Sequence, residues 1–231
     1  MNLAGAVAAD AVDTGDAVAL GAVDAVVFDC DGVLVDSLGS VDRSWRRWSL
    51  DLGLDPDAVL EVIHGQPTRD SVSSLLPAED VDAAIVLIDR YELGDVDDVT
   101  AMPGAVALLA AIPPGRWAVV TSASRELFTA RFAAAGLSQP AIVITADDVT
   151  RGKPHPEGYS DAMRRLGVAP AQAAIFEDSG GGIAAAIASG AGTVIRVGTG
   201  EPGPGQAAVV ADLRSVSWRD GLVLYPDGAI T

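Results

Sequence analysis

The stretch AVVFDCDGVLVDS covers residues 25–37 and joins a short apolar run directly to two aspartates. Four consecutive apolar residues, Ala25 to Phe28, are typical of a buried strand and too few for a helix. Asp29 and Asp31 follow at once, and side chains two positions apart on extended backbone point to the same side. The stretch therefore predicts a buried strand whose carboxyl end presents two carboxylates together. Cys30, between them, is expected to face the other way and to serve as buried packing.

Similar apolar runs recur along the chain, and each ends at a polar residue. They cover residues 117–120, 141–144, 174–176 and 193–197, with a weaker run at 209–211. Amphipathic stretches that predict helices lie at 104–111, 124–135, 156–166 and 181–189. Gly136, Gly167 and Gly190 stand where three of these helices would end. The alternation predicts an α/β fold with a doubly wound, Rossmann-like parallel sheet.

Residues 37–100 interrupt this alternation. The pattern there is helical, with Trp45 and Trp48 three positions apart, and it shows no convincing strand. Pro56 and Pro67 stand where helices could begin. The sequence thus predicts a core of residues 23–36 and 101–231, interrupted by a small α-helical cap of residues 37–100. The two tryptophans are expected to pack inside that cap.

Composition limits the classes of partner. The chain has 231 residues and a formal net charge of −17. A surface of this sign repels nucleic acid and anionic lipid, so neither is an expected partner. No apolar stretch approaches the roughly 20 residues that cross a bilayer. A monomer is the default expectation.

The single cysteine excludes an internal disulfide and a cysteine-based metal site, which agrees with a cytoplasmic location. Residues 1–22 contain no Lys or Arg, which argues against a signal peptide, and they are expected to form a flexible leader.

The carboxyl ends of parallel strands meet at one edge of a sheet, where ligands bind. Four separate segments are expected to bring polar side chains to that edge: Asp29, Asp31, Thr121, Ser122, Lys153, Glu177 and Asp178. Clustered carboxylates need a cation, and hard oxygen ligands suit Mg²⁺. A lysine and hydroxyl groups can bind a phosphoryl group that one carboxylate attacks in line.

Four segments resemble the motifs of the haloacid dehalogenase superfamily, in the same order and at similar spacing. DCDGVLVDS (29–37) resembles the first motif, DxDGxxxDS, and VVTSAS (119–124) the second. GKPHP (152–156) resembles the third, and FEDSGGGI (176–183) the fourth, EDSxxGI. Within the superfamily, the chain is similar to the hexitol, sugar and glycerol-phosphate phosphatases, and β-phosphoglucomutases have the same core motifs.

The resemblance implies a role for each matching residue. Asp29 would be the nucleophile and Asp31 the general acid and base. The residues that would bind phosphate are Thr121, Ser122, Ala123 and Lys153. Mg²⁺ would be held by Asp29, Asp178, the backbone carbonyl of Asp31 and, directly or through water, Glu177. His64 and Arg69 in the cap are candidate substrate contacts.

The expected function is Mg²⁺-dependent hydrolysis of a small sugar- or polyol-phosphate through an aspartyl-phosphate. Two questions stay open at this point. A β-phosphoglucomutase-like phosphomutase would use the same Asp29 and Asp31, because only the acceptor of the phosphoryl group differs. Either Thr121 or Ser122 can supply the phosphate-binding hydroxyl.

Overall fold

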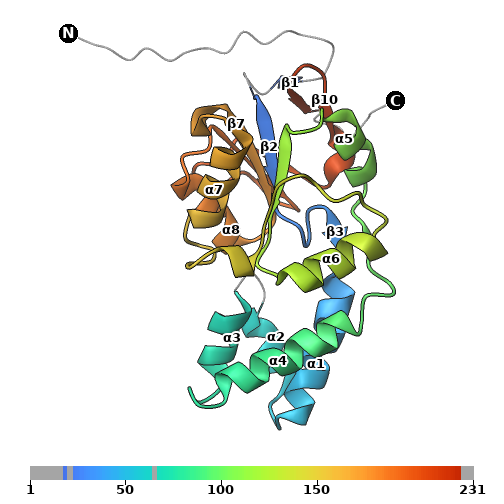
Figure 1. Ribbon diagram of the computed structural model, residues 1–231, viewed down its shortest axis with the longest axis vertical. Helices are drawn as coiled ribbons and strands as arrows, with labels where there is room; N and C mark the ends of the chain where they lie inside the picture. The colour runs from blue at the N-terminus through green and yellow to red at the C-terminus, as the bar shows by residue number, and fades with distance from the viewer. Residues whose placement is uncertain (1–17, 20–22, 64–66, 225–231) are drawn as a thin grey trace, which may run out of the picture.

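A computed structural model describes residues 18–19, 23–63 and 67–224 of the chain (Figure 1). Its centre is a parallel sheet with the strand order β6-β5-β2-β7-β8-β9. The strands are β2 (Ala25–Phe28), β5 (Trp117–Val120), β6 (Val143–Ile144), β7 (Ala173–Glu177), β8 (Thr193–Val197) and β9 (Ala208–Val210). The chain builds outward from β2 to β6 and then returns to β7 on the other side of β2. This reversal creates a topological switch point between β2 and β7, where doubly wound sheets bind ligands.

The register of the strands aligns their carboxyl ends. Phe28 of β2 pairs with Val119 of β5 and with Phe176 of β7. The backbone N–H of Asp29 continues this ladder by donating to the carbonyl of Phe176 at 2.9 Å. The residues that follow β2, β5 and β7 therefore emerge at one level.

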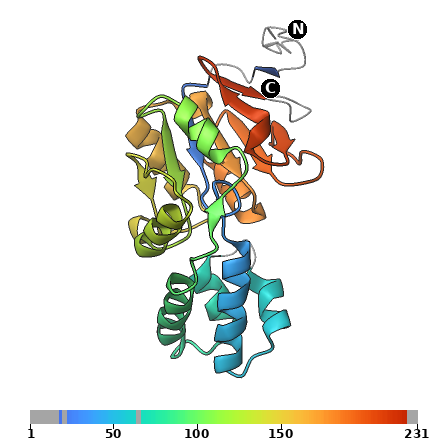
Figure 2. The same cartoon turned by 90° about the vertical axis from the view of Figure 1, so that its right-hand side faces the viewer.

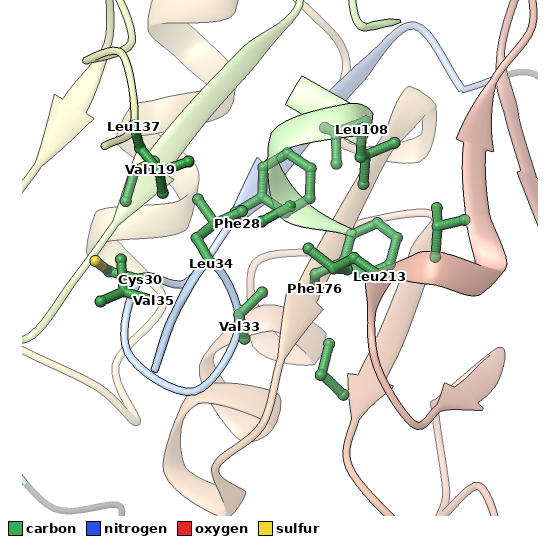
Figure 3. Close-up of a cluster of buried hydrophobic side chains, with 14 of the residues drawn as sticks. Phe28, Cys30, Val33, Leu34, Val35, Leu108, Val119, Leu137, Phe176 and Leu213 are labelled. Carbon is green, nitrogen blue, oxygen red and sulfur yellow. The ribbon is translucent and has the colours of Figure 1, made fainter. Parts of the chain in front are cut away.

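Helices cover both faces of the sheet, as Figure 1 shows. On one face lie α5 (Ala105–Ala111) and α6 (Arg125–Ala134), and on the other α7 (Glu157–Leu166) and α8 (Gly180–Ala188). Alternation along β2 explains both layers, because Val26 and Phe28 pack with α5 and α6 while Val27 packs with α7 and α8. Figure 3 shows the first cluster, in which the rings of Phe28 and Phe176 stack with centroids 5.2 Å apart. The predicted α/β class with a doubly wound parallel sheet is confirmed.

Four helices form a separate layer below the sheet in Figures 1 and 2. They are α1 (Leu38–Asp51), α2 (Pro56–Ile63), α3 (Thr68–Leu75) and α4 (Val81–Leu93). They enclose a hydrophobic cluster of their own, which contains Trp45 and Trp48. Trp48 is fully buried, and its indole N–H donates to the carbonyl of Ala84 at 2.9 Å. The two tryptophans thus pack α1 against the other helices of this layer.

A short antiparallel ribbon joins the helical layer to the sheet (Figure 2). It pairs β3 (Val35–Asp36) with β4 (Thr100–Ala101). The expectation that residues 37–100 contain no strand is therefore wrong at Thr100. Two-residue strands show no periodicity, and this pair forms between segments more than 60 positions apart in the chain.

A small antiparallel sheet, β1-β11-β10, was also missed. It consists of β1 (Val18–Ala19), β11 (Leu222–Leu224) and β10 (Val216–Trp218). The expected flexible leader therefore contains a strand at Val18–Ala19, and the rest of residues 1–22 lies outside the described part of the chain. Three short 3₁₀ turns occur at η1 (Ala146–Asp148), η2 (Pro170–Gln172) and η3 (Leu213–Ser215).

Element boundaries agree with the sequence where periodicity is strong. The strands predicted at 25–28, 117–120 and 193–197 are observed with those bounds, whereas the one predicted at 141–144 is shortened to Val143–Ile144. Gly136, Gly167 and Gly190 follow α6, α7 and α8 with positive φ angles of 67°, 71° and 78°. None of the described helices combines the length and apolarity that crossing a bilayer requires.

Trp48→Leu is expected to lower the free energy of unfolding by about 2–4 kcal/mol, because it leaves a cavity and removes the donor to Ala84. Urea unfolding followed by circular dichroism measures this loss. Leu50→Ala is the matched control on the same helix, since Leu50 is 67% exposed and its truncation should change stability by less than about 0.5 kcal/mol. Equal losses in the two variants would show that Trp48 does not stabilise the helical layer.

Candidate active site

A cavity of about 180 Å³ lies between the carboxyl edge of the sheet and the helical layer. The sheet side contributes the predicted residues Asp29, Asp31, Thr121, Ser122, Ala123, Lys153 and Asp178. The helical layer contributes Trp45, Asp89 and Glu92, among others. Segments that are far apart in the chain thus line one cavity.

Asp29 extends β2 into this cavity and is 7% exposed. Its Oδ1 accepts a hydrogen bond from Lys153 Nζ at 2.5 Å. Burial is the largest influence on the Asp29 carboxyl and raises its pKa, whereas the Lys153 ammonium opposes that rise. Cys30 faces the opposite way, into the hydrophobic cluster of Figure 3, as expected from alternation along the strand.

Lys153 is buried between two carboxylates. Its Nζ donates to Asp29 Oδ1 and to Glu177 Oε1, both at 2.5 Å. Burial alone would lower the pKa of Lys153, but attraction to Asp29 and Glu177 outweighs it and raises the pKa well above the usual value. The side chain is therefore a fixed positive charge between the carboxylates of Asp29 and Glu177.

Glu177 has no exposed surface, and both its oxygens are occupied. Oε1 accepts from Lys153 and, at 2.8 Å, from the hydroxyl of Tyr159. Oε2 accepts from the backbone N–H of Ser179 at 2.9 Å and from its hydroxyl at 3.1 Å. Burial would raise the Glu177 pKa, but Lys153 and these donors lower it. Glu177 is thus an ionised acceptor that holds Lys153 in place.

The start of α8 packs against this carboxylate. The Ser179 hydroxyl accepts from the backbone N–H of Gly182 at 3.0 Å, so Ser179 caps the helix. A Cβ at Gly182 would lie 1.6 Å from Glu177 Oε1. The glycine run after Asp178 therefore gives the helix room to approach Glu177.

Asp178 lies against the loop that follows Asp29. Gly32 in that loop has φ +82°, and a Cβ there would stand 2.2 Å from Asp178 Oδ2. Both facts require glycine after the two aspartates. Burial, followed by repulsion from Glu177, raises the pKa of Asp178 to about 7. Ionisation of Asp178 would add a third carboxylate charge to those of Asp29 and Glu177. That charge is therefore unfavourable unless a cation is present in addition to Lys153.

One carboxylate oxygen from each of Asp29, Glu177 and Asp178 lies within 4.8 Å of the other two. Such a set of hard oxygen donors fits Mg²⁺, and the raised pKa of Asp178 shows the electrostatic reason for a cation there. Asp29 and Asp178 have the freer oxygens, because those of Glu177 already accept from protein donors.

Asp31 is held by two donors that contact the same oxygen. Its Oδ1 accepts from the hydroxyl of Ser37 at 2.6 Å and from Arg131 Nη1 at 3.1 Å. Arg131 also donates through Nη2 to Glu92 Oε1 at 3.2 Å. Sequence reasoning missed Arg131, Glu92 and Tyr159. Nothing local marks them, because each acts on a residue at least 18 positions away.

The two hydroxyls that follow β5 differ in surroundings. Thr121 is buried, and its Oγ1 accepts from the backbone N–H of Ala123 at 3.0 Å. The Ser122 side chain is exposed, and among the described residues its hydroxyl has no hydrogen-bonding partner. Ser122 is therefore the more accessible of the two hydroxyls, while Thr121 also lines the cavity and keeps its own proton to donate.

The predicted cap contacts have different outcomes. His64 lies outside the described residues. Arg69 is exposed and forms an ion pair with Asp82 at 2.9 Å. It lines a second, adjoining cavity of about 890 Å³ and is absent from the lining of the cavity that holds Asp29. Asp89 of α4 lines both cavities, although no motif or spacing marks it in the sequence.

Comparisons with known proteins find relatives that are named as phosphatases. Hexitol phosphatase A from Escherichia coli (strain K12) is 38% identical over 172 residues, covering 71% of this chain and 78% of that protein. Glycerol-1-phosphate phosphohydrolase 2 from Saccharomyces cerevisiae is 33% identical over 186 residues, covering 73% and 72%.

Several solved structures are also similar to this chain. A HAD family hydrolase from Deinococcus radiodurans R1, with bound phosphate and sodium, is 29% identical with a TM-score of 0.61, covering 84% of this chain and 94% of that one. CbbY from Rhodobacter sphaeroides, in complex with phosphate, has a TM-score of 0.72 at 21% identity, covering 83% and 95%, and shows the likeness of fold.

The family described as haloacid dehalogenase-like hydrolase matches residues 23–190, a span that includes the strand-end carboxylates, Lys153 and the four helices of the inserted layer. With that match, and with relatives above 30% identity along most of its length, the chain belongs to the haloacid dehalogenase-like hydrolases.

Proposed function

We propose that the protein is a Mg²⁺-dependent phosphatase that hydrolyses a small sugar- or polyol-phosphate through a phosphorylated Asp29. One observation carries the proposal. The Asp29 carboxylate stands at the switch point of the sheet, 2.5 Å from a buried ammonium and within a cluster of carboxylates suited to a metal. A candidate nucleophile, a positive charge and a set of possible metal ligands thus lie together around one carboxyl group, which suits phosphoryl transfer.

Phosphoryl binding rests on residues around Asp29. Lys153 supplies a fixed positive charge, and the Ser122 hydroxyl and the backbone N–H groups beside Ala123 supply donors for the phosphoryl oxygens. Asp29 and Asp178 would hold Mg²⁺ with the backbone carbonyl of Asp31, and Glu177 would act mainly by orienting Lys153. When bound, Mg²⁺ would supply positive charge that offsets the charge of the phosphoryl oxygens, so that the anionic Asp29 carboxylate could approach phosphorus.

Asp31 is suited to act as the general acid and base of the reaction. It lies two residues after Asp29 on the same cavity wall, and only one of its oxygens is tied to donors in the described part of the chain. Asp31 would protonate the leaving oxygen as the ester bond breaks, and then accept a proton from the water that attacks phosphorylated Asp29. The products are the free alcohol and inorganic phosphate.

The charges around both cavities favour a leaving group with no charge of its own. In the described part of the chain, each lysine, arginine and histidine side chain that lines them already faces a carboxylate. Arg131 and Lys153 contact two carboxylates each, while Arg69 faces Asp82, and Arg151 and His155 both face Glu157. A second anionic group on the substrate would find no free partner there, whereas the hydroxyls of a sugar or polyol can donate to carboxylates.

Most names of the relatives support the same substrate class, whereas a phosphoglycolate phosphatase, 33% identical, is named for a substrate with a carboxylate. Those above 30% identity include a hexitol phosphatase, glycerol-1-phosphate phosphohydrolases and 2-deoxyglucose-6-phosphate phosphatases. A structure titled as a putative β-phosphoglucomutase is 24% identical and bears on the fold alone. A mutase must also accommodate a bisphosphate, which the paired cations disfavour. Hydrolysis is therefore the better-supported reaction.

Asp29→Asn is expected to reduce kcat by at least about a hundredfold, because the amide cannot attack phosphorus. Phosphate release from a panel of sugar and polyol monophosphates, with and without Mg²⁺, measures this loss. Asp36→Asn is the matched control, since Asp36 lies in the same segment but is exposed and outside the cavity. If the Asp29→Asn variant kept more than a few per cent of the wild-type rate, Asp29 would not be the nucleophile.

Mg²⁺ affinity should depend on pH through Asp178. Its pKa is about 7 without metal, and Mg²⁺ binds the ionised carboxylate, so protons compete with the metal as the pH falls below that value. The apparent Kd for Mg²⁺ should be about tenfold higher at pH 6 than at pH 8. Calorimetric titration with MgCl₂ in the absence of substrate tests this. Equal affinity at the two pH values would exclude Asp178 as a titrating metal ligand.

Asp89→Lys should change substrate preference. Asp89 is half-buried at both cavities and, among the described residues, has no hydrogen bond or ion pair, so its carboxylate is free to accept from substrate hydroxyls. We expect kcat/KM for polyol phosphates to fall about tenfold and to rise for substrates with a second anionic group. Glu79→Lys makes the same charge change on the surface just before α4. Identical substrate profiles in the two variants would contradict a specificity role for Asp89.

A further inference from the structure

Arg131 connects three parts of the molecule. It lies on α6 and is 3% exposed. Its Nη1 donates to Asp31 in the loop after β2, and its Nη2 donates to Glu92 near the end of α4. Its Nε is buried and has no hydrogen-bonding partner in the described part of the chain. The guanidinium is thus placed for its two carboxylate contacts, although this placement leaves a buried donor unsatisfied.

These contacts fix one oxygen of Asp31 and leave the other open. Arg131 Nη1 and the Ser37 hydroxyl both donate to Oδ1, at 3.1 Å and 2.6 Å. Within the described residues, Oδ2 accepts no hydrogen bond. A carboxyl oxygen that already accepts two hydrogen bonds is a poor place for a proton. A proton on Asp31 is therefore directed to Oδ2.

Glu92 is a second carboxylate partner for the buried positive charge of Arg131. It is 5% exposed, and its Oε1 accepts from Arg131 Nη2 at 3.2 Å. Without Glu92, the buried guanidinium of Arg131 would have only Asp31 as a carboxylate partner. The cost of removing its charge from water would then be poorly compensated. Because α4 contributes Glu92, the helical layer helps to hold Arg131 against Asp31.

We infer that Arg131 is a positioning residue, which holds Asp31 Oδ1 so that Oδ2 faces the leaving oxygen and carries the proton delivered to it. The inference rests on the proposed phosphatase function and adds Arg131, with Glu92 as its counter-ion, to that machinery. During ester cleavage an Asp29 oxygen forms a bond to phosphorus while the P–O bond to the alcohol breaks, and the electron pair of the broken bond takes the proton from Asp31 Oδ2. Asp31 is left ionised and keeps its Arg131 contact.

Leaving-group dependence separates this role from a purely structural one. An alkyl phosphate needs a proton on its departing oxygen, whereas p-nitrophenyl phosphate releases a stable anion. We expect Arg131→Met to lower the ratio of kcat/KM for the best alkyl phosphate to that for p-nitrophenyl phosphate by about 10- to 100-fold. Asp31→Asn should lower the same ratio at least as far. kcat/KM is the correct quantity, because it covers only the steps up to the first irreversible one.

Two further variants complete the test. In an Asp31→Asn background, Arg131→Met should cause little additional change in the ratio, because the two residues act as one unit. Arg131→Lys keeps the charge and one donor, so it should recover part of the ratio, and it serves as the main probe if the Met variant does not fold. Equal losses on both substrates, or the full effect of Arg131→Met without Asp31, would overturn the inference. Absence of Asp29-dependent phosphate release in the wild type would instead refute the proposed function.

Discussion

The ammonium of Lys153 is the charge on which the arrangement of the site depends. It is buried between Asp29 and Glu177, with Asp178 close by. When ionised, three carboxylates and one ammonium leave two negative charges in a space that is largely closed to water, and the raised pKa of Asp178 reflects that excess. A divalent cation has the charge needed to restore balance. The same electrostatic imbalance therefore favours a metal ion beside these carboxylates.

Several features serve to hold this charge in one position. Tyr159 and Ser179 occupy the remaining acceptor sites of Glu177, so that this carboxylate stays ionised and in place. Gly182 and Gly32 allow α8 and the loop after β2 to approach without side chains between them. Rigid placement matters because electrostatic stabilisation of a transition state depends on charges that do not need to reorganise. The close approach of α8 to Glu177, and of the loop after β2 to Asp178, thus fixes the positions of the charged groups.

The sequence predicted what is local and missed what depends on distant contacts. Asp29, Lys153 and Asp178 end short apolar runs or lie in recognisable turns, so their meeting at one sheet edge follows from parallel-strand geometry. Ser179 as a helix cap could likewise be read from its position before the glycine run. Arg131 contacts Asp31 across 100 positions and Glu92 across 39, and on its own helix it resembles any solvent-facing arginine. The β3–β4 ribbon was missed for a similar reason, since each strand has only two residues and is defined by its partner.

The order in which contacts can form follows from where the helical layer is inserted. All four of its helices lie within residues 38–93, whereas β2 finds its partners β5 and β7 only after residues 117 and 173. Contacts close in sequence form faster than distant ones, because less chain entropy is lost in closing the loop. During synthesis the helical layer can therefore assemble while β2 still lacks both neighbours. Pairing of β3 with β4 then brings together the two chain segments that flank the helical layer. This pairing shortens the loop that must close when β2 pairs with β5 and β7.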